Sequence, residues 1–341
     1  MKTQEFNFNL DPRVMPHDPV ELRGKSRDSG RMIVLDRSAG KIEHTVFSTI
    51  CDHFRPGDLL VLNDSYMLSN TLSFQHGDDS AQVTMYGFEP DDTTIVEIKS
   101  EQVSVKPGLA LTSTNDDRLT CSLLVPQPYG FWKARFEPFQ LLVPTLDQYG
   151  QRLDEDTHPK PTSWKAAPQA YRSVYAQSPG SLEIPWAGLH FSKELLTEIT
   201  AKGVEIAHIT MDVGATGTFA VRHIIEEEVE DHRIGYRAAA QISRALAERR
   251  RIIAVGTKVM LAADRESKTY VEAQGAWADL YIYPGHDFKV VDVLLTNLQQ
   301  PRSSHIVLTA ASAGKDFVMR SYADFADKGG YEFDMFGDCM V

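Results

Sequence analysis

A change of texture along the chain constrains its fold more than any other feature. Between residues 66 and 145, short apolar stretches such as AQVTMYGFE and TTIVEIKS recur between clusters of Asp, Gly, Asn and Pro, and helical periodicity is nearly absent. Strands at such spacing are typical of a small antiparallel barrel or sandwich. From about residue 181, strand-like runs alternate with helical ones, which is typical of a largely parallel sheet with helices on its faces.

The two textures together predict a discontinuous α/β protein with an insertion. We expect residues 1–65 and 146–341 to form an α/β domain with a mixed, largely parallel sheet and flanking helices, and residues 66–145 to form an inserted antiparallel β-barrel. Strands are expected at RMIVLD, LLVL, VEIAHITMDV and IIAV, with further strand-like runs at LYIY, VVDVLLTN and SHIVLTAASAG; these are residues 31–36, 59–62, 204–213, 252–255, 280–283, 290–297 and 304–314.

Helix signals are clearest in SKELLTEITAKG. Ser192 stands where an N-cap is expected, and Gly203 stands where a C-cap is expected. An amphipathic helix is also predicted around residues 46–54, and another within HRIGYRAAAQISRALAERRR.

Composition and charge exclude several classes of protein. The chain has 341 residues, of which 42% are hydrophobic and 24% charged, as in a globular protein. Its net charge of −12 disfavours a protein that coats nucleic acid non-specifically, although a local basic patch can still exist on it. The candidate patches are residues 23–27 and 248–251. The second is more simply explained as the charged end of a helix.

Cysteine usage and hydropathy indicate the compartment. Cys51, Cys121 and Cys339 are far apart and form no CxxC pair, which argues against a disulfide framework and against a structural zinc site. No apolar run is long enough to cross a bilayer, and the N-terminal residues lack the apolar core of a secretory signal. We therefore expect a cytoplasmic protein with no membrane partner.

Polar and small residues gather at four expected strand ends. They are Asp212–Gly214, Gly256–Lys258, Pro284–His286 and Thr296–Asn297. Because ligands of open α/β sheets bind beyond the carboxyl ends of the strands, these positions indicate a site. The turn DVGATGTFAVR (212–222) could hold backbone N–H groups toward a ligand, or it could be an ordinary corner. The chain contains no P-loop, GxGxxG, GxSxG or HExxH motif, and its histidines lack metal-ligand spacing.

Five motifs carry a resemblance to a known family. IPWAGLHF (184–191), TMDVGATGTFAVR (210–222), IIAVGT (252–257), YIYPGHDFKVVDVLLTN (281–297) and FGDCM (336–340) resemble, in order and spacing, the S-adenosylmethionine:tRNA ribosyltransferase-isomerases of queuosine synthesis. The resemblance extends over essentially the whole chain and implies an α/β domain with an inserted β-barrel. It also implies that S-adenosylmethionine is a substrate whose ribosyl group moves to the aminomethyl group of a deazaguanine base in the tRNA anticodon. Adenine and methionine leave in that reaction.

The resemblance also implies roles for individual residues. We expect His232 and Asp338 to do acid/base work, with His190 and Lys258 as their polar partners; the work includes removing a proton beside the sulfonium, which acidifies the adjacent carbon. No metal is expected. The residues expected to line the S-adenosylmethionine or acceptor site are Gly214, Gly217, Thr218, Gly256, Thr257 and Asn297.

Several polar positions of the family pattern are replaced in this chain. The replacing residues are Tyr66, Gly235, Arg237, Lys258, Leu261, Asp264 and Gln299. Losing arginine, histidine and glutamate side chains removes planar anion contacts and acid/base groups. Two alternatives to a tRNA-modifying enzyme therefore stay open. One is a divergent paralogue that uses S-adenosylmethionine on a small-molecule acceptor or as a lyase, and the other is a non-catalytic binding relative.

Overall fold

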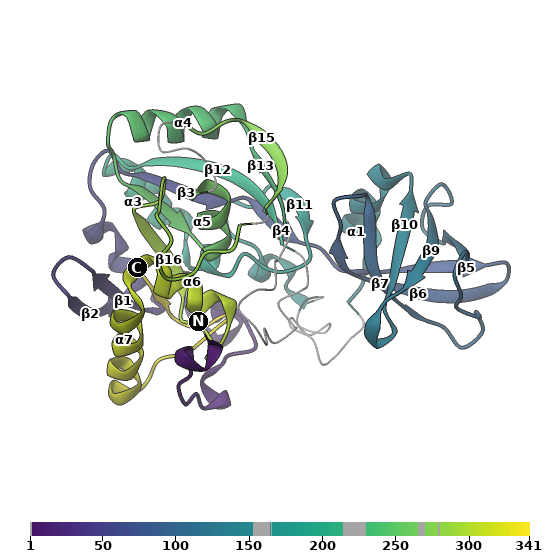
Figure 1. Cartoon of the computed structure of the whole chain (residues 1–341), viewed down its shortest axis with the longest axis horizontal. Coiled ribbons are helices and arrows are strands. Elements are labelled where there is room, and N and C mark those ends of the chain that lie inside the picture. The colour runs from purple at the N-terminus through teal and green to yellow at the C-terminus, as the bar shows by residue number, and fades with distance from the viewer. Residues whose placement is uncertain (1, 153–163, 165, 214–229, 265–269, 279) are drawn as a thin grey trace.

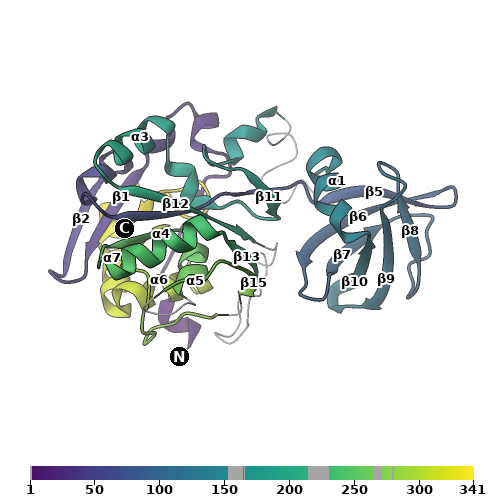
Figure 2. The same ribbon diagram turned by 90° about the horizontal axis from the view of Figure 1, so that it is seen from above.

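The structure is a computed structural model that describes residues 2–152, 164, 166–213, 230–264, 270–278 and 280–341. Figures 1 and 2 show a larger body of mixed sheet and helices, with a smaller β-barrel beside it. The expected combination of an α/β part with an antiparallel barrel is confirmed.

A nine-stranded sheet of described residues forms the larger body. Its order is β15-β13-β12-β3-β14-β16-β17-β1-β2. The four central strands are parallel; they are β12 (Glu205–Asp212), β3 (Leu59–Asn63), β14 (Ile252–Val255) and β16 (Val293–Asn297). Antiparallel pairing prevails on the flanks, where only β17 and β1 pair in parallel; the flanking strands are β13 (Glu230–Ile234), β15 (Gln274–Ala278), β17 (Cys339–Met340), β1 (Arg31–Asp36) and β2 (Lys41–Val46).

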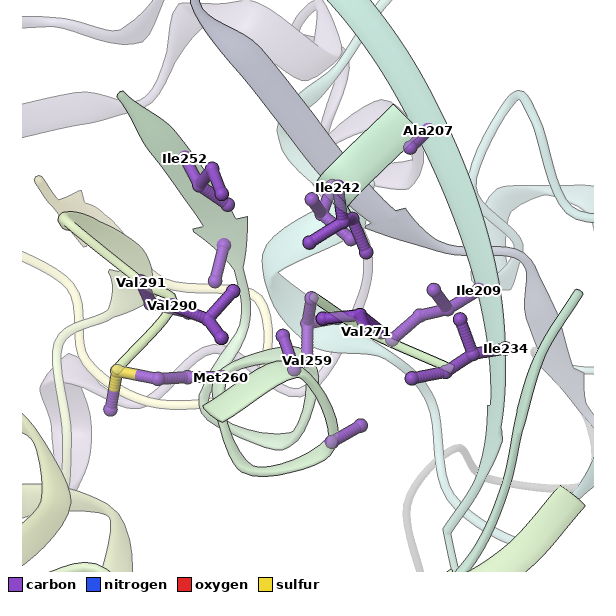
Figure 3. Close-up of a cluster of buried hydrophobic side chains, with 14 of the residues drawn as sticks. Ala207, Ile209, Ile234, Ile242, Ile252, Val259, Met260, Val271, Val290 and Val291 are labelled. Carbon is purple, nitrogen blue, oxygen red and sulfur yellow. The ribbon is translucent and has the colours of Figure 1, made fainter. Parts of the chain in front are cut away.

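Burial of both faces explains why the central strands are continuous apolar runs. Every residue of β3 and β14 is buried. Leu59 and Val61 pack into one hydrophobic cluster, and Leu60 and Leu62 pack into another, because side chains alternate across a strand. The first cluster, shown in Figure 3, includes residues of α4 (Tyr236–Ala247), α5 (Thr257–Asp264) and α6 (Ser304–Ala313). The second includes residues of α3 (Lys193–Ala201).

Helix α3 begins and ends as its sequence predicts. The Ser192 hydroxyl accepts a hydrogen bond from the Leu195 N–H at 3.1 Å, which satisfies one of the free donors of the first turn. Gly203 follows the last turn with a φ of +90°, in the left-handed region that favours glycine.

The barrel closes from six antiparallel strands in the order β10-β7-β6-β5-β8-β9. Burial alternates along β6, so every second side chain points into the barrel. We propose residues 66–145 as the limits of this domain. Its strands are β5 (Thr71–His76), β6 (Asp79–Phe88), β7 (Thr93–Lys99), β8 (Ala110–Ser113), β9 (Thr120–Pro126) and β10 (Trp132–Glu137), followed by α1 (Leu142–Tyr149). Beside its entry, β4 (Ser65–Met67) pairs in parallel with β11 (Ser178–Ser181).

Three local expectations differ from the structure. Residues 47–53 form a 3-10 helix. Residues 304–313, expected as a strand, form helix α6, because the Ser303 hydroxyl caps the Ile306 N–H and alanines favour a helix; α7 (Lys315–Lys328) follows it. Residues 280–283 form no strand. The chain just beyond them is held in a loop by the Asp264 carboxylate, which accepts the N–H groups of Lys289 and Val290.

Candidate active site

A cleft lies beyond the carboxyl ends of the parallel strands, and we call it the strand-end cleft. Asn63 at the end of β3, Gly256 after β14 and Asn297 at the end of β16 all line it. The position agrees with the rule that open α/β sheets bind ligands at this edge. Further lining residues are Tyr175, Glu183, Trp186, Val213, Thr257, Lys258, Gln299 and Met335.

The turn after β14 brings backbone and helix to the strand-end cleft. Gly256 has a φ of +93°, which an L side chain rarely adopts, and its N–H donates to the Leu295 carbonyl at 2.7 Å. Helix α5 begins at the next residue, Thr257, so its first N–H groups lie at the cleft with Lys258. A helix N-terminus carries partial positive charge and favours anionic groups.

His190 and Asn297 are joined by a hydrogen bond that fixes the proton on the imidazole. The Asn297 Nδ2 donates to the Met335 carbonyl at 2.8 Å, so its Oδ1 is the atom that faces His190 Nε2, at 3.2 Å. The His190 side chain is 7% exposed, and this burial lowers its pKa to about 4. The ring is therefore neutral near pH 7, Nε2 carries the proton, and Nδ1 presents a lone pair.

A second pocket lies on the other side of His190, and we call it the basic-rimmed pocket. Four cationic side chains line it: Arg23, Lys25, Arg27 and Arg31. Gly30, His190 and Asp338 also line it. A Cβ atom placed on Gly30 would lie 3.5 Å from Asp338 Oδ1 and 3.8 Å from His190 Nδ1, so both acceptors face the space that glycine leaves open.

Asp338 is a buried carboxyl group held by two backbone donors. Its Oδ1 accepts the Arg31 N–H at 2.6 Å, and its Oδ2 accepts the Glu332 N–H at 2.8 Å. Burial raises the pKa of Asp338 to about 6, although the two N–H donors act in the opposite direction. A carboxyl group with such a pKa can exchange a proton close to neutral pH.

The two pockets adjoin. Trp186 and Met335 line both of them. His190 lines the basic-rimmed pocket, while its hydrogen-bond partner Asn297 lines the strand-end cleft. One hydrogen bond therefore crosses the wall between them.

The structure divides the predicted site residues between these pockets. His190 and Asp338 lie at the basic-rimmed pocket. Gly256, Thr257, Lys258 and Asn297 lie at the strand-end cleft. The backbone of His232 belongs to β13 and pairs with Met211 and Ala276, but its side chain is outside the described part of the chain, as are Gly214, Gly217 and Thr218. The roles given to all these residues stay predictions.

Sequence reasoning missed Trp186 and Met335, which no local pattern marks as site residues. It singled out residues 23–27 as a basic patch, and these do line a pocket. The other patch is structural. Arg251 pairs with Asp58 through an Nε–Oδ1 contact of 3.0 Å, and Arg250 pairs with Glu205 at 3.0 Å, so these two arginines fasten the end of the α4 segment to the sheet.

A metal-ligand cluster and a membrane-spanning helix are both absent from the described residues. Among them, no group of three or more His, Cys, Asp and Glu side chains could hold a metal ion. No described helix has the length and apolar character needed to span a membrane.

Comparison with known proteins identifies the family of this chain. A family model described as "Queuosine biosynthesis protein" matches residues 3–341. The chain belongs to this family. Relatives named S-adenosylmethionine:tRNA ribosyltransferase-isomerase, from Desulfitobacterium hafniense and Thermotoga maritima, are 34% and 35% identical to it, covering 100% of this chain and 99% of each relative. The crystal structure of the S-adenosylmethionine tRNA ribosyltransferase of Thermotoga maritima is similar to it with a TM-score of 0.54 and 28% identity, over 98% of this chain and 99% of that one.

The replaced positions of this queuosine biosynthesis family member have partners within the chain. Asp264 is fully buried and accepts from His286 as well as from the loop N–H groups. The Gln299 Nε2 donates to the Thr296 hydroxyl at 2.8 Å. The Tyr66 hydroxyl donates to Asp147 at 3.0 Å, and the Arg172 guanidinium lies 3.8 Å from the centre of the Tyr66 ring.

Proposed function

We propose that this protein is an S-adenosylmethionine-dependent tRNA ribosyltransferase-isomerase. In the proposed reaction the ribosyl group of S-adenosylmethionine moves to the amino group of a modified tRNA base, and adenine and methionine leave. One observation carries this proposal: relatives named for this activity match 100% of the chain and 99% of their own length at 31–35% identity.

The strand-end cleft has groups that suit S-adenosylmethionine. The ring faces of Trp186 and Tyr175 can attract a cation such as the sulfonium, and they can also stack on a purine. The carboxylate of Glu183 can attract the ammonium group of the methionine part, while Lys258 and the start of α5 can attract its carboxylate. Opposite charges on the cleft wall thus match opposite charges on one zwitterionic substrate.

Acid/base work falls to a small set of groups. The reaction needs a base beside the sulfonium and stabilisation of departing adenine. Asp338, with a pKa near 6, supplies a proton-accepting group at the adjoining pocket. His190 supplies a hydrogen-bond acceptor there through its unprotonated Nδ1, in its predicted role as a polar partner. His232 keeps its predicted role as a further acid or base. Lys258 keeps its predicted role as a polar partner.

The two alternatives have less support. Use of a small-molecule acceptor and loss of catalysis were suggested by the replaced polar positions, yet the relatives share one activity name over their full length. We also propose the cytoplasm as the compartment, since Cys51, Cys121 and Cys339 are all buried and unpaired.

Release of adenine tests the proposed function. The purified protein is incubated with S-adenosylmethionine, with and without tRNA that carries the aminomethyl precursor base, and adenine and methionine are followed by mass spectrometry. We expect adenine release that requires the tRNA. Release without tRNA would instead support a lyase or small-molecule enzyme, and S-adenosylmethionine binding without release under either condition would support a non-catalytic relative.

A further inference from the structure

We propose that the basic-rimmed pocket is the acceptor site, which takes the amino group of the target base together with adjoining RNA phosphates. In this arrangement S-adenosylmethionine occupies the strand-end cleft. The inference rests on the proposed function for the identity of the two substrates, but the division of labour between the pockets follows from their residues.

The floor of the pocket recognises a hydrogen-bond donor. His190 is more than nine-tenths buried, and its Nδ1 makes no hydrogen bond within the described chain. Because the His190 Nε2–H donates to the Asn297 Oδ1, the Nδ1 of the neutral ring has no proton and is an acceptor. The Asp338 Oδ1 faces the same space above Gly30 and can only accept when ionised. Two converging acceptors suit an amine or ammonium group and disfavour an anionic one.

The rim of the same pocket recognises negative charge. Arg23 is bound to Glu332 and to the Phe336 carbonyl, and Arg27 is bound to Glu21 and to the Arg172 carbonyl; these contacts hold both guanidinium groups in place. Lys25 and Arg31 are exposed at the rim. Arg31 lies with its guanidinium carbon 4.3 Å from the centre of the Tyr331 ring. Glu332 and Glu21 line the pocket too and offset the charges of Arg23 and Arg27, so Lys25 and Arg31 carry the excess positive charge of the rim, which suits phosphate oxygens.

The positive charge of this rim contrasts with the negative charge of the rest of the protein, which favours the rim as the RNA-binding surface. The net charge of the chain is −12, and the barrel segment 66–145 contains ten Asp and Glu but only five Lys and Arg. A polyanion is repelled by such a surface. The segment from residue 19 to residue 31 has the opposite balance, with four Lys and Arg against two Asp and Glu.

The position of the pocket is what a transfer reaction needs. The donor and acceptor substrates have to meet, and the two pockets adjoin at Trp186 and Met335. A base that reaches the floor at His190 brings its amino group to the wall shared with the strand-end cleft. Neither pocket alone offers both the zwitterion-matching wall and the cationic rim.

Charge reversal at the rim tests the assignment. Lys25→Glu is compared with Lys106→Glu, which makes the same change of charge at an exposed position between barrel strands β7 and β8. Binding of a fluorescently labelled anticodon stem-loop RNA is followed by anisotropy across a salt series, and S-adenosylmethionine binding by calorimetry. We expect Lys25→Glu to weaken RNA binding by about tenfold and to reduce the salt slope by about one. We expect Lys106→Glu to stay within about twofold of the wild type, and both variants to bind S-adenosylmethionine normally.

Three results would overturn the assignment. They are equal RNA affinities for the two variants, a loss of S-adenosylmethionine binding in Lys25→Glu, and a wild-type chain that does not bind the RNA. Failure of the proposed function looks different. In that case the wild type binds the RNA and Lys25→Glu weakens this binding, but no adenine is released from S-adenosylmethionine in the presence of the precursor tRNA.

Discussion

The two nitrogens of His190 can be tested separately, because each faces a different pocket. In His190→Gln the side-chain amide nitrogen reaches the place of Nε2 and can still donate to the Asn297 Oδ1, but no acceptor remains at the place of Nδ1. In His190→Asn the amide oxygen takes the place of Nδ1, and the donor to Asn297 is lost. The pair of variants therefore removes one function at a time from a single buried ring.

The hydrogen bond that each variant loses sets the size of its effect. A hydrogen bond between Nδ1 and a charged amino group contributes about 1.5–3 kcal/mol, so His190→Gln should lower kcat/KM for tRNA by roughly ten- to one-hundredfold. Its free energy of unfolding should change little. In His190→Asn the Oδ1 of Asn297, a residue 4% exposed, loses its donor, which costs about 1–3 kcal/mol of stability.

Steady-state release of adenine, with tRNA varied at saturating S-adenosylmethionine, measures the first effect, and urea unfolding measures the second. Calorimetric S-adenosylmethionine binding serves as the control and should be unchanged in His190→Gln. A kcat/KM for tRNA that stays within about twofold of the wild type in His190→Gln would refute the role given to Nδ1. A fall in S-adenosylmethionine affinity in this variant would refute it as well.

Two further predictions concern stability. Arg251→Gln should lower the free energy of unfolding in urea by about 1.5–3 kcal/mol, because Asp58, which is 3% exposed, loses its cationic partner and keeps the Arg55 N–H as a donor. The exposed Arg249→Gln should change it by no more than about 0.5 kcal/mol, and equal effects would contradict a structural role for the pair. Asp338 has its pKa raised from 3.8 to about 6 in the fold, so the native state loses stability as its carboxyl ionises between those values. Between pH 4 and pH 7, Asp338→Asn should therefore gain about 3 kcal/mol relative to the wild type in urea unfolding, and a difference independent of pH would refute the burial argument.

Local patterns predicted much of the fold because they report local physics. The apolar runs at residues 59–62 and 252–255 predicted strands, which the structure shows to be buried on both faces, and Ser192 marked the start of a helix. The short apolar stretch AQVTMYGFE predicted a strand of a small barrel or sandwich, and residues 79–88 form barrel strand β6. Each of these features depends on neighbours within a few residues.

Two segments were wrongly predicted to be strands, because the sequence pattern of each is compatible with more than one local structure. The run at residues 304–313 is apolar enough for a buried strand, but the cap at Ser303 and the alanines decide for a helix. At residues 280–283 the aromatic and β-branched residues favour a strand. Contacts of Asp264 with the following loop, more than twenty positions away in the sequence, produce an irregular segment there.

The candidate site was predicted residue by residue but not as two pockets. His190 and Asn297 are 107 positions apart, and no local pattern indicates that one hydrogen bond joins them. The same is true of the contact between Asp338 and the Arg31 N–H, which brings the start of β1 to the end of the chain. Such contacts depend on the order of strands in the sheet, which a single sequence does not state.

Gly30 distinguishes a protein with a working acceptor site from a relative that has kept only the fold. Its φ is −61°, which every residue adopts, and an added Cβ would meet its nearest atoms at ordinary contact distance. Neither backbone strain nor crowding therefore requires glycine at this position. Alanine there would reduce the conformational entropy of the unfolded chain and would cover the two acceptors on His190 and Asp338. A chain that kept only its fold would gain from that change, whereas a chain that brings an amino group to those two atoms needs the space open.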